Sequence, residues 1–206
     1  MDIIVYVFMF VIGVLLGSFY TLAVHRIPLK QDITHTRSYC PKCNHKLNFL
    51  DLIPILSYIF LGGKCRYCKN RIRPRYIIIE IISGIIFLCF AIAVNVDLLN
   101  IEYTKIATLI FGIMFFSTVF IIIGILKEYK KIQVSVFNFG IITTIVYMIY
   151  LYVLRNNIYR YIIYIALLSI IAILNNKKST QEITRKIMFA IYMSINIAEI
   201  FMLMLG

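Results

Sequence analysis

Residues 40–43 read Cys-Pro-Lys-Cys and residues 65–68 read Cys-Arg-Tyr-Cys, and both motifs lie in one basic segment between two long apolar runs. Each motif brings two sulfurs within reach of one tetrahedral ion, and the intervening residues 44–64 allow the two pairs to close on the same metal, as in a zinc ribbon. The sequence therefore predicts a structural zinc site. Its four predicted ligands are Cys40, Cys43, Cys65 and Cys68.

Two other uses of these cysteines remain open. Two disulfides would require an oxidising compartment. Thiol redox chemistry usually rests on one C-x-x-C motif beside a βαβ pattern, which this sequence lacks. The fifth cysteine, Cys89, lies inside an apolar run and is interpreted as a small buried hydrophobic residue.

The composition is that of a membrane protein. Hydrophobic residues make up 62% of the chain, charged residues only 15%, and the mean hydropathy is +0.91, whereas soluble domains are about half apolar and a quarter charged. Six apolar runs approach the roughly 20 residues that cross a bilayer. They cover about 3–24, 77–94, 106–126, 134–154, 158–174 and 187–205. We predict an all-α polytopic integral membrane protein with about six transmembrane helices.

Three regions follow from this pattern: a first transmembrane helix at 1–24, a cysteine loop at 25–76, and a membrane domain of about five helices at 77–206. The first run has no basic segment before it and no small-residue cleavage site after it, so we expect it to be retained as a helix rather than removed as a signal peptide. Residues 155–157, between the fourth and the short fifth run, are compatible with a tight extracytoplasmic turn or with a broken span.

The distribution of basic residues predicts the topology. Of the 21 lysines and arginines, eleven lie between the first two runs, three follow the third and four follow the fifth. The positive-inside rule then places the cysteine loop in the cytoplasm and both termini outside, in a multi-pass protein of the plasma membrane. A reducing cytosol favours zinc over disulfides. The net charge of +12 is explained by topology and anionic lipid, so we predict no nucleic-acid partner.

An ordered series of motifs accompanies the cysteines: Gly17-Ser18-Phe19, Arg26-x-Pro28, Asp51-Leu-Ile-Pro-Ile-Leu-Ser57, Gly63-Lys-Cys-Arg-Tyr-Cys68, Arg75-Tyr76-x-x-x-Glu80 and Gly84. Over about residues 13–88 the chain resembles the N-terminal half of the bacterial prepilin leader peptidases. Members of that family are membrane-embedded aspartic peptidases, and the resemblance implies their activity here: cleavage of the basic leader of type IV prepilins and of pseudopilins used in protein secretion. Many members also methylate the new N-terminus with S-adenosylmethionine. That cofactor is expected here through the resemblance alone.

The second half departs from the family pattern. The first catalytic aspartate would fall at Gly124 to Leu126, and the second, in a G-x-G-D-x-K motif, would fall at Thr184. The chain's four aspartates, Asp2, Asp32, Asp51 and Asp97, all lie elsewhere. An aspartic peptidase needs paired carboxylates, so we predict a pseudoenzyme without a catalytic pair. Glu128 and Glu182 are the only acidic residues in these two loops and the only candidates for a replacement pair.

Several single residues allow both a structural and a functional interpretation. Gly17 in an apolar helix favours close helix contact. The apolar stretch at 51–61 is too short to span, and we expect it to lie at the membrane interface as an amphipathic arm, with Asp51 as its cap and Pro54 in its first turn. Glu80 is a functional candidate or the partner of a loop arginine. Asn196 and Glu199 share one face of the last predicted span, which favours an interhelical hydrogen bond over a functional site.

Three function classes remain open from the sequence. The chain could cleave, and also methylate, prepilin-like or pseudopilin substrates. It could bind those proteins, or the pilus or secretion assembly machinery, without catalysis. It could also be a zinc-ribbon membrane module with an unrelated partner. A homo-oligomer or hetero-oligomer is compatible with each class, because a second protein could supply a missing catalytic half.

Overall fold

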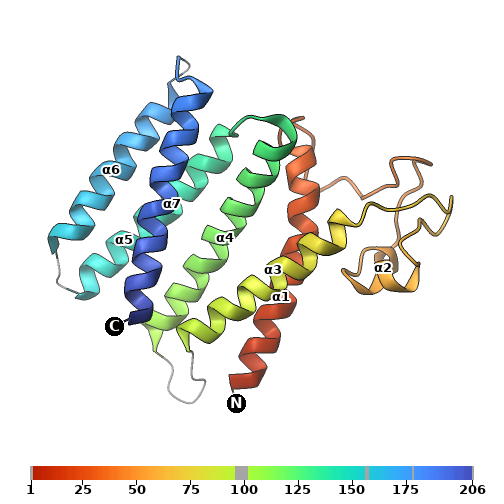
Figure 1. Cartoon of the computed structure of the whole chain (residues 1–206), viewed down its shortest axis with the longest axis horizontal. Coiled ribbons are helices and arrows are strands. Elements are labelled where there is room, and N and C mark those ends of the chain that lie inside the picture. Colours follow the sequence, from red (N-terminus) through yellow and green to blue (C-terminus); the bar gives the residue numbers. More distant parts are fainter. Residues whose placement is uncertain (1, 96–101, 156–157, 178, 206) are drawn as a thin grey trace. The chain divides into compact units, whose positions relative to one another are not determined.

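The computed structural model describes residues 2–95, 102–155, 158–177 and 179–205, and helices dominate this part of the chain outside the cysteine loop. The helices are α1 (Asp2–Arg26), the 3-10 helix η1 (Phe49–Asp51), α2 (Leu56–Phe60), α3 (Arg75–Val94), α4 (Tyr103–Tyr129), α5 (Val134–Arg155), α6 (Ile158–Asn176) and α7 (Glu182–Leu205) (Figure 1). The chain forms two compact units, Met1–Asn100 and Ile101–Gly206. The cysteine loop therefore belongs to the first unit, together with α1 and α3.

Five of the described helices are long and apolar enough to cross a membrane. They are Ile3–Arg26, Arg75–Val94, Tyr103–Tyr129, Val134–Leu154 and Tyr159–Asn176. The predicted class, an all-α polytopic membrane protein, is confirmed. The sixth predicted run is helical within α7, which is not among the five, so its passage through the membrane stays a prediction. Asn156 and Asn157 of the predicted turn lie outside the described residues, as does Asp97.

Helices α1 and α3 pack closely through small residues. The hydroxyl of Ser83 on α3 donates a hydrogen bond to the carbonyl of Gly13 on α1 over 2.7 Å. A Cβ atom added at Gly17 would lie 2.9 Å from the Cα atom of Glu80, closer than real Cβ atoms approach backbone. Small residues let apolar helices approach in lipid, where hydrophobic burial gives little drive for association. The predicted close-contact role of Gly17 is confirmed.

Replacing Gly17 with alanine should destabilise this helix pair, because the new methyl group would push α1 away from backbone atoms of α3. Overpacking of this kind typically costs about 1–3 kcal/mol. Thermal unfolding of the detergent-purified protein, followed by circular dichroism, should show a lower midpoint for Gly17→Ala. The control Leu15→Ala changes an exposed side chain of the same helix and should leave the midpoint nearly unchanged. Equal midpoints for Gly17→Ala and the wild type would contradict the packing explanation.

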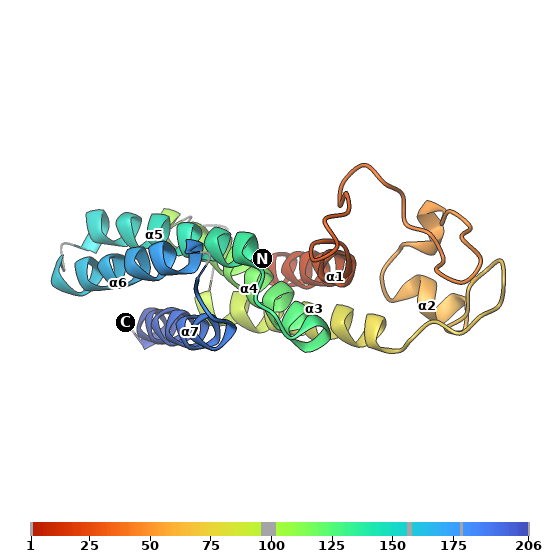
Figure 2. The same ribbon diagram turned by 90° about the horizontal axis from the view of Figure 1, so that it is seen from above.

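The second unit consists of α4 to α7, with α5 in contact with both α4 and α6 (Figures 1 and 2). Its core is rich in aromatic rings, and Phe137 packs edge-on against Tyr192 with 5.6 Å between the ring centroids. Polar side chains are paired between helices. The carboxylate of Glu199, which is fully buried, accepts hydrogen bonds from Tyr161 (3.1 Å) and Arg160 (3.3 Å). Glu199 therefore joins α7 to α6, in the interhelical role that the sequence favoured.

The predicted burial of Cys89 is wrong, because its side chain is exposed on α3. Its neighbours Phe87 and Phe90 occupy the buried face of the helix. An apolar sequence cannot distinguish these faces, because in a membrane both the packed face and the lipid-facing face are hydrophobic.

The predicted region boundaries at residues 24 and 76 fall close to the end of α1 at Arg26 and the start of α3 at Arg75. Within the first unit α3 packs against α1, although the sequence grouped α3 with the later helices. Assignment of these regions as separate domains stays a prediction.

Candidate metal centre

Each C-x-x-C motif forms the same tight turn. The main-chain N–H of Cys40 donates to the carbonyl of His45 over 3.0 Å, and that of Cys65 donates to the carbonyl of Asn70 over 2.8 Å. The fifth residue of each turn, Asn44 or Lys69, has a positive φ of 56° or 58°. A single antiparallel bridge closes the base of each turn. The loop therefore presents two similar knuckles, each with two sulfurs.

The two knuckles bring all four sulfurs together. The Sγ atoms of Cys40, Cys43, Cys65 and Cys68 all lie within 4.8 Å of one another. The Cys40 and Cys68 sulfurs are 3.9 Å apart. A tetrahedral zinc ion with Zn–S bonds of about 2.3 Å places its sulfurs about 3.8 Å apart. The cysteines are free thiols rather than disulfides in the structure, and their arrangement fits a metal ion of this size.

The surroundings favour the thiolate form of Cys40 and disfavour the thiolate form of Cys43. Burial opposes ionisation of Cys40, but hydrogen bonds from the N–H groups of Cys43 and Lys42 outweigh it and lower its pKa to about 7. At Cys43 the N–H of His45 favours the thiolate, yet desolvation and the neighbouring sulfurs of Cys40 and Cys68 raise the pKa to about 11. Four adjacent thiolates repel one another, so a bound cation is what would let all of them ionise together.

Side chains of the second knuckle form hydrogen bonds with the segment that follows the first knuckle. Arg66 Nε donates to Asp51 Oδ1 over 2.6 Å, and the Tyr67 hydroxyl donates to Asp51 Oδ2 over 3.3 Å. The ring of His45 packs on the ring of Tyr67, with 3.6 Å between the centroids. Burial opposes ionisation of Asp51, but the Arg66 hydrogen bond keeps its pKa below the ordinary value. Closure of the metal centre and placement of residues 48–51 are thereby linked.

The predicted role of Asp51 as the cap of a longer helix is wrong. Asp51 ends η1, its Oδ2 accepts the N–H of Asn48 over 3.2 Å, and α2 begins only at Leu56. Pro54 accordingly precedes α2 instead of lying in its first turn. The strong partner of the carboxylate is Arg66, fifteen positions away, and local capping rules do not consider such a distant donor.

A strained turn within the cysteine loop forms a hydrogen bond with α3. Ile55 has φ 61° and ψ −57°, and the N–H of Leu56 donates to the carbonyl of Pro54 over 2.6 Å. This γ-turn conformation is rare for any residue and especially unfavourable for a β-branched one. The turn directs the N–H of Ile55 at Glu80 Oε2, 2.8 Å away. The buried carboxylate of Glu80 therefore accepts a hydrogen bond from the backbone of this turn, a partner that the sequence did not predict.

Arg26 holds the first part of the cysteine loop through hydrogen bonds, a structural role that the count of basic residues did not predict. Its guanidinium is buried and donates to the carbonyls of Asp32 (2.9 Å) and Thr36 (3.0 Å) and to the Thr36 hydroxyl (2.9 Å). Arginine can hold several acceptors at once because its five N–H groups are fixed in a plane. The Arg26-x-Pro28 motif was the available signal.

The two glutamates proposed as a replacement catalytic pair lie in the second unit. Glu182 Oε1 accepts a hydrogen bond from Arg185 over 2.8 Å, and its Oε2 accepts the N–H of Ile132 over 3.1 Å. The Oε2 contact ties the start of α7 to the segment before α5, while the Oε1 contact stays within α7. Glu128 lies in the last turn of α4. A catalytic role for either glutamate stays a prediction.

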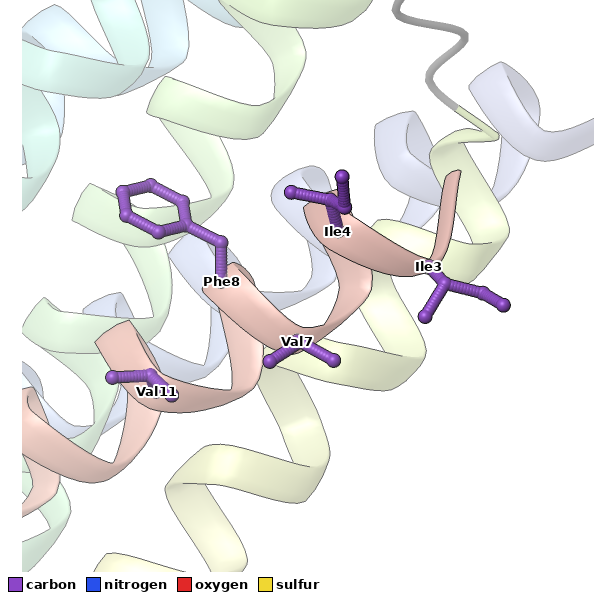
Figure 3. A pocket seen from close by; sticks show the side chains of 5 residues that line it. All are labelled: Ile3, Ile4, Val7, Phe8 and Val11. Atoms are coloured by element: carbon purple, nitrogen blue, oxygen red, sulfur yellow. The ribbon is translucent and has the colours of Figure 1, made fainter. Parts of the chain in front are cut away.

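A shallow apolar groove lies along α1 near its N-terminus (Figure 3). It is lined by Ile3, Ile4, Val7, Phe8 and Val11. The groove has no polar side chain that could orient a substrate. It therefore offers no chemistry and matches a helix face that meets lipid.

Fold and site together define a helical, multi-pass membrane protein whose first loop carries a four-cysteine centre. Residues 11–94 match the family described as the Bacterial Peptidase A24 N-terminal domain. The predicted resemblance to prepilin leader peptidases is confirmed for this N-terminal part of the chain. No solved structure matches the chain.

Curated relatives match the same part. The chain is 42% identical over 81 residues to the prepilin leader peptidase/N-methyltransferase of Myxococcus xanthus. The matched region covers 39% of this chain and 24% of the relative. The enzyme of that name from Vibrio cholerae is 40% identical over 86 residues, covering 37% and 34%. That of Bacillus subtilis is 41% identical over 90 residues, covering 44% and 36%. The chain thus matches about a third or less of the length of these relatives.

Proposed function

We propose that this chain binds the leader segments of prepilin-like or pseudopilin proteins at the membrane without cleaving them. The observation that carries the proposal is a contrast between the two units. The first unit builds the four-cysteine centre within the residues that match the leader peptidase family. In the second unit, Glu182 is engaged by Arg185 and by the backbone of Ile132, and Thr184 stands at an expected aspartate position.

We infer that the metal is zinc and that its role is structural. Four cysteine sulfurs form a closed ligand set, and a closed tetrahedral set leaves no position for a substrate or a reactive water. The bound ion would hold the two knuckles together and so keep Arg66 and Tyr67 in contact with Asp51. Methyl transfer from S-adenosylmethionine would be a separate activity, supported only by the names of the matching relatives.

Leader binding can be tested by co-expression with a type IV prepilin that carries a photo-crosslinking residue beside its leader. We expect a crosslinked pair in which the leader is still attached. The control is a multi-pass membrane protein of similar size and unrelated sequence, which should give no crosslink. A crosslink no stronger than that of the control would overturn the binding proposal.

The topology proposed from the basic residues has its own test. Alkaline phosphatase is active only outside the cytosol, so a fusion after Gly206 should be active and a fusion after His35, within the cysteine loop, should be inactive. The reverse pattern would place the cysteines in an oxidising compartment and favour disulfides over zinc.

A further inference from the structure

We propose that the apolar arm, defined as residues 49–60 of the cysteine loop, docks on the anionic lipid surface of the membrane that α1 and α3 cross. This inference is independent of leader binding and of catalysis. The arm comprises η1, the γ-turn at Ile55 and α2, of which α2 is labelled in Figure 1. It is a short stretch of loop with an apolar surface that the described part of the chain leaves uncovered.

Large hydrophobic side chains of the arm point away from the protein. Phe49 is 81% exposed and Phe60 is 83% exposed. Four further exposed hydrophobic side chains belong to the same segment: Leu50, Leu52, Leu56 and Ile59. Soluble surfaces rarely gather so many apolar groups in one short segment, and such a patch marks a contact with a membrane or with another protein.

The arm is also free of exposed charge. Its single ionisable acid, Asp51, has a side chain only 3% exposed and is turned toward Arg66. The ion pair thus removes from the surface the one carboxylate that anionic lipid would repel. The 47% exposed side chain of Arg66 keeps a cationic group beside the arm. Interfacial segments have this combination of apolar side chains with flanking basic groups.

The position of the arm along α3 is suited to a membrane interface. The hydrogen bond from Ile55 to Glu80 fixes the arm to α3 five residues after the helix begins at Arg75. Five residues of helix rise about 7.5 Å. Arg75 lies over the ring of Tyr76, 5.3 Å from its centroid, and cationic and aromatic residues of this kind anchor helix ends at the headgroup level. The hydrogen bond therefore holds the middle of the arm within about 7.5 Å, along the helix axis, of the point where α3 enters lipid.

The positive charge of the whole cysteine loop favours anionic lipid over a basic leader peptide as the partner of the apolar arm. Residues 26–75 contain eleven lysines and arginines but only two acidic residues, Asp32 and Asp51. A polybasic segment next to a spanning helix is attracted to the anionic headgroups of the same leaflet. A basic leader segment would be repelled from the arm itself, so the proposed leader binding would involve other parts of the chain.

The absence of tryptophan from the chain allows a direct test. Phe60→Trp introduces one fluorophore on the arm, and His35→Trp introduces one on a 90% exposed side chain of the same loop outside the arm. The full-length variants are reconstituted in vesicles of phosphatidylcholine, with and without phosphatidylglycerol, using acyl chains that are plain or brominated. Brominated chains quench a fluorophore that contacts lipid, whereas acrylamide quenches one that contacts water.

In vesicles with phosphatidylglycerol, Phe60→Trp should emit at shorter wavelength than His35→Trp, be quenched by brominated chains and resist acrylamide. Omission of phosphatidylglycerol, or high salt, should weaken the difference because the electrostatic attraction is screened. Phe49→Trp should behave like Phe60→Trp. Acrylamide quenching of the arm variants as strong as that of His35→Trp would overturn the proposal. Resistance to acrylamide without quenching by brominated chains would also overturn it, because protein rather than lipid would then cover the arm.

Discussion

Purified protein should carry about one zinc ion per chain, and the variant Cys65→Ser should carry almost none. The four sulfurs lie within 4.8 Å of one another, so one tetrahedral ion can bind all of them, and a serine hydroxyl at neutral pH is a far weaker zinc ligand than a thiolate. Cys65 is buried, which leaves little room for a replacement ligand. Metal analysis by mass spectrometry measures the stoichiometry directly.

Loss of the ion should also loosen the loop, because metal binding and the folding of a small metal site are coupled. Residues 44–64 should become sensitive to limited proteolysis in Cys65→Ser, since Arg66 would no longer be held against Asp51. The matched control is Cys89→Ser, which changes an exposed cysteine of α3 that is not part of the cluster. It should retain zinc and resist the protease. Full zinc content in Cys65→Ser would show that the four-sulfur assignment is wrong.

Co-expressed prepilin should keep its leader in the presence of this chain alone. Peptide hydrolysis by an aspartic peptidase needs one carboxylate as base and a second as acid, held so close that they share a proton. The side chains at Gly124 to Leu126 cannot ionise, and the hydroxyl of Thr184 is neither a useful acid nor a useful base at neutral pH. Removing members of a catalytic unit lowers turnover by on the order of 10⁴-fold or more in other hydrolases.

The experiment compares the wild type with Glu128→Gln and Glu182→Gln, and mass spectrometry of the prepilin N-terminus reports both cleavage and methylation. All three forms should leave the leader intact, while a matching relative such as the Bacillus subtilis enzyme serves as the positive control. Cleavage by the wild type that disappears in either variant would establish a glutamate pair. In that case Glu182 would have to exchange its contacts with Arg185 and Ile132 for contacts with substrate.

Binding and cleavage are separable in these measurements. A crosslink without cleavage supports the proposed function, and cleavage together with a crosslink identifies an active enzyme. The lipid test of the apolar arm depends on neither result, because it reads the surroundings of Phe60 and Phe49 in vesicles that contain no prepilin. Failure of one proposal therefore leaves the others open to their own tests.

The sequence by itself determined the class of protein and the composition of the candidate site. Hydrophobic runs predict membrane helices because the bilayer requires about 20 apolar residues in a row, a condition set within one segment. The spacing of each C-x-x-C motif likewise orients its two sulfurs through a local turn, and the two turns adopt equivalent hydrogen bonds. Close packing at Gly17 was predictable for the same reason, since a missing side chain is a local property.

Only the tertiary structure decided which distant groups meet. Asp51 pairs with Arg66, Ile55 with Glu80, and Arg26 with the carbonyls of Asp32 and Thr36. Each pairing depends on the path of a loop whose local preferences permit many paths, and the strained conformation of Ile55 is one that local preference would reject. The exposure of Cys89 was undecidable for a different reason: lipid and protein core are similarly apolar, so hydrophobicity alone does not show which side of a membrane helix is packed.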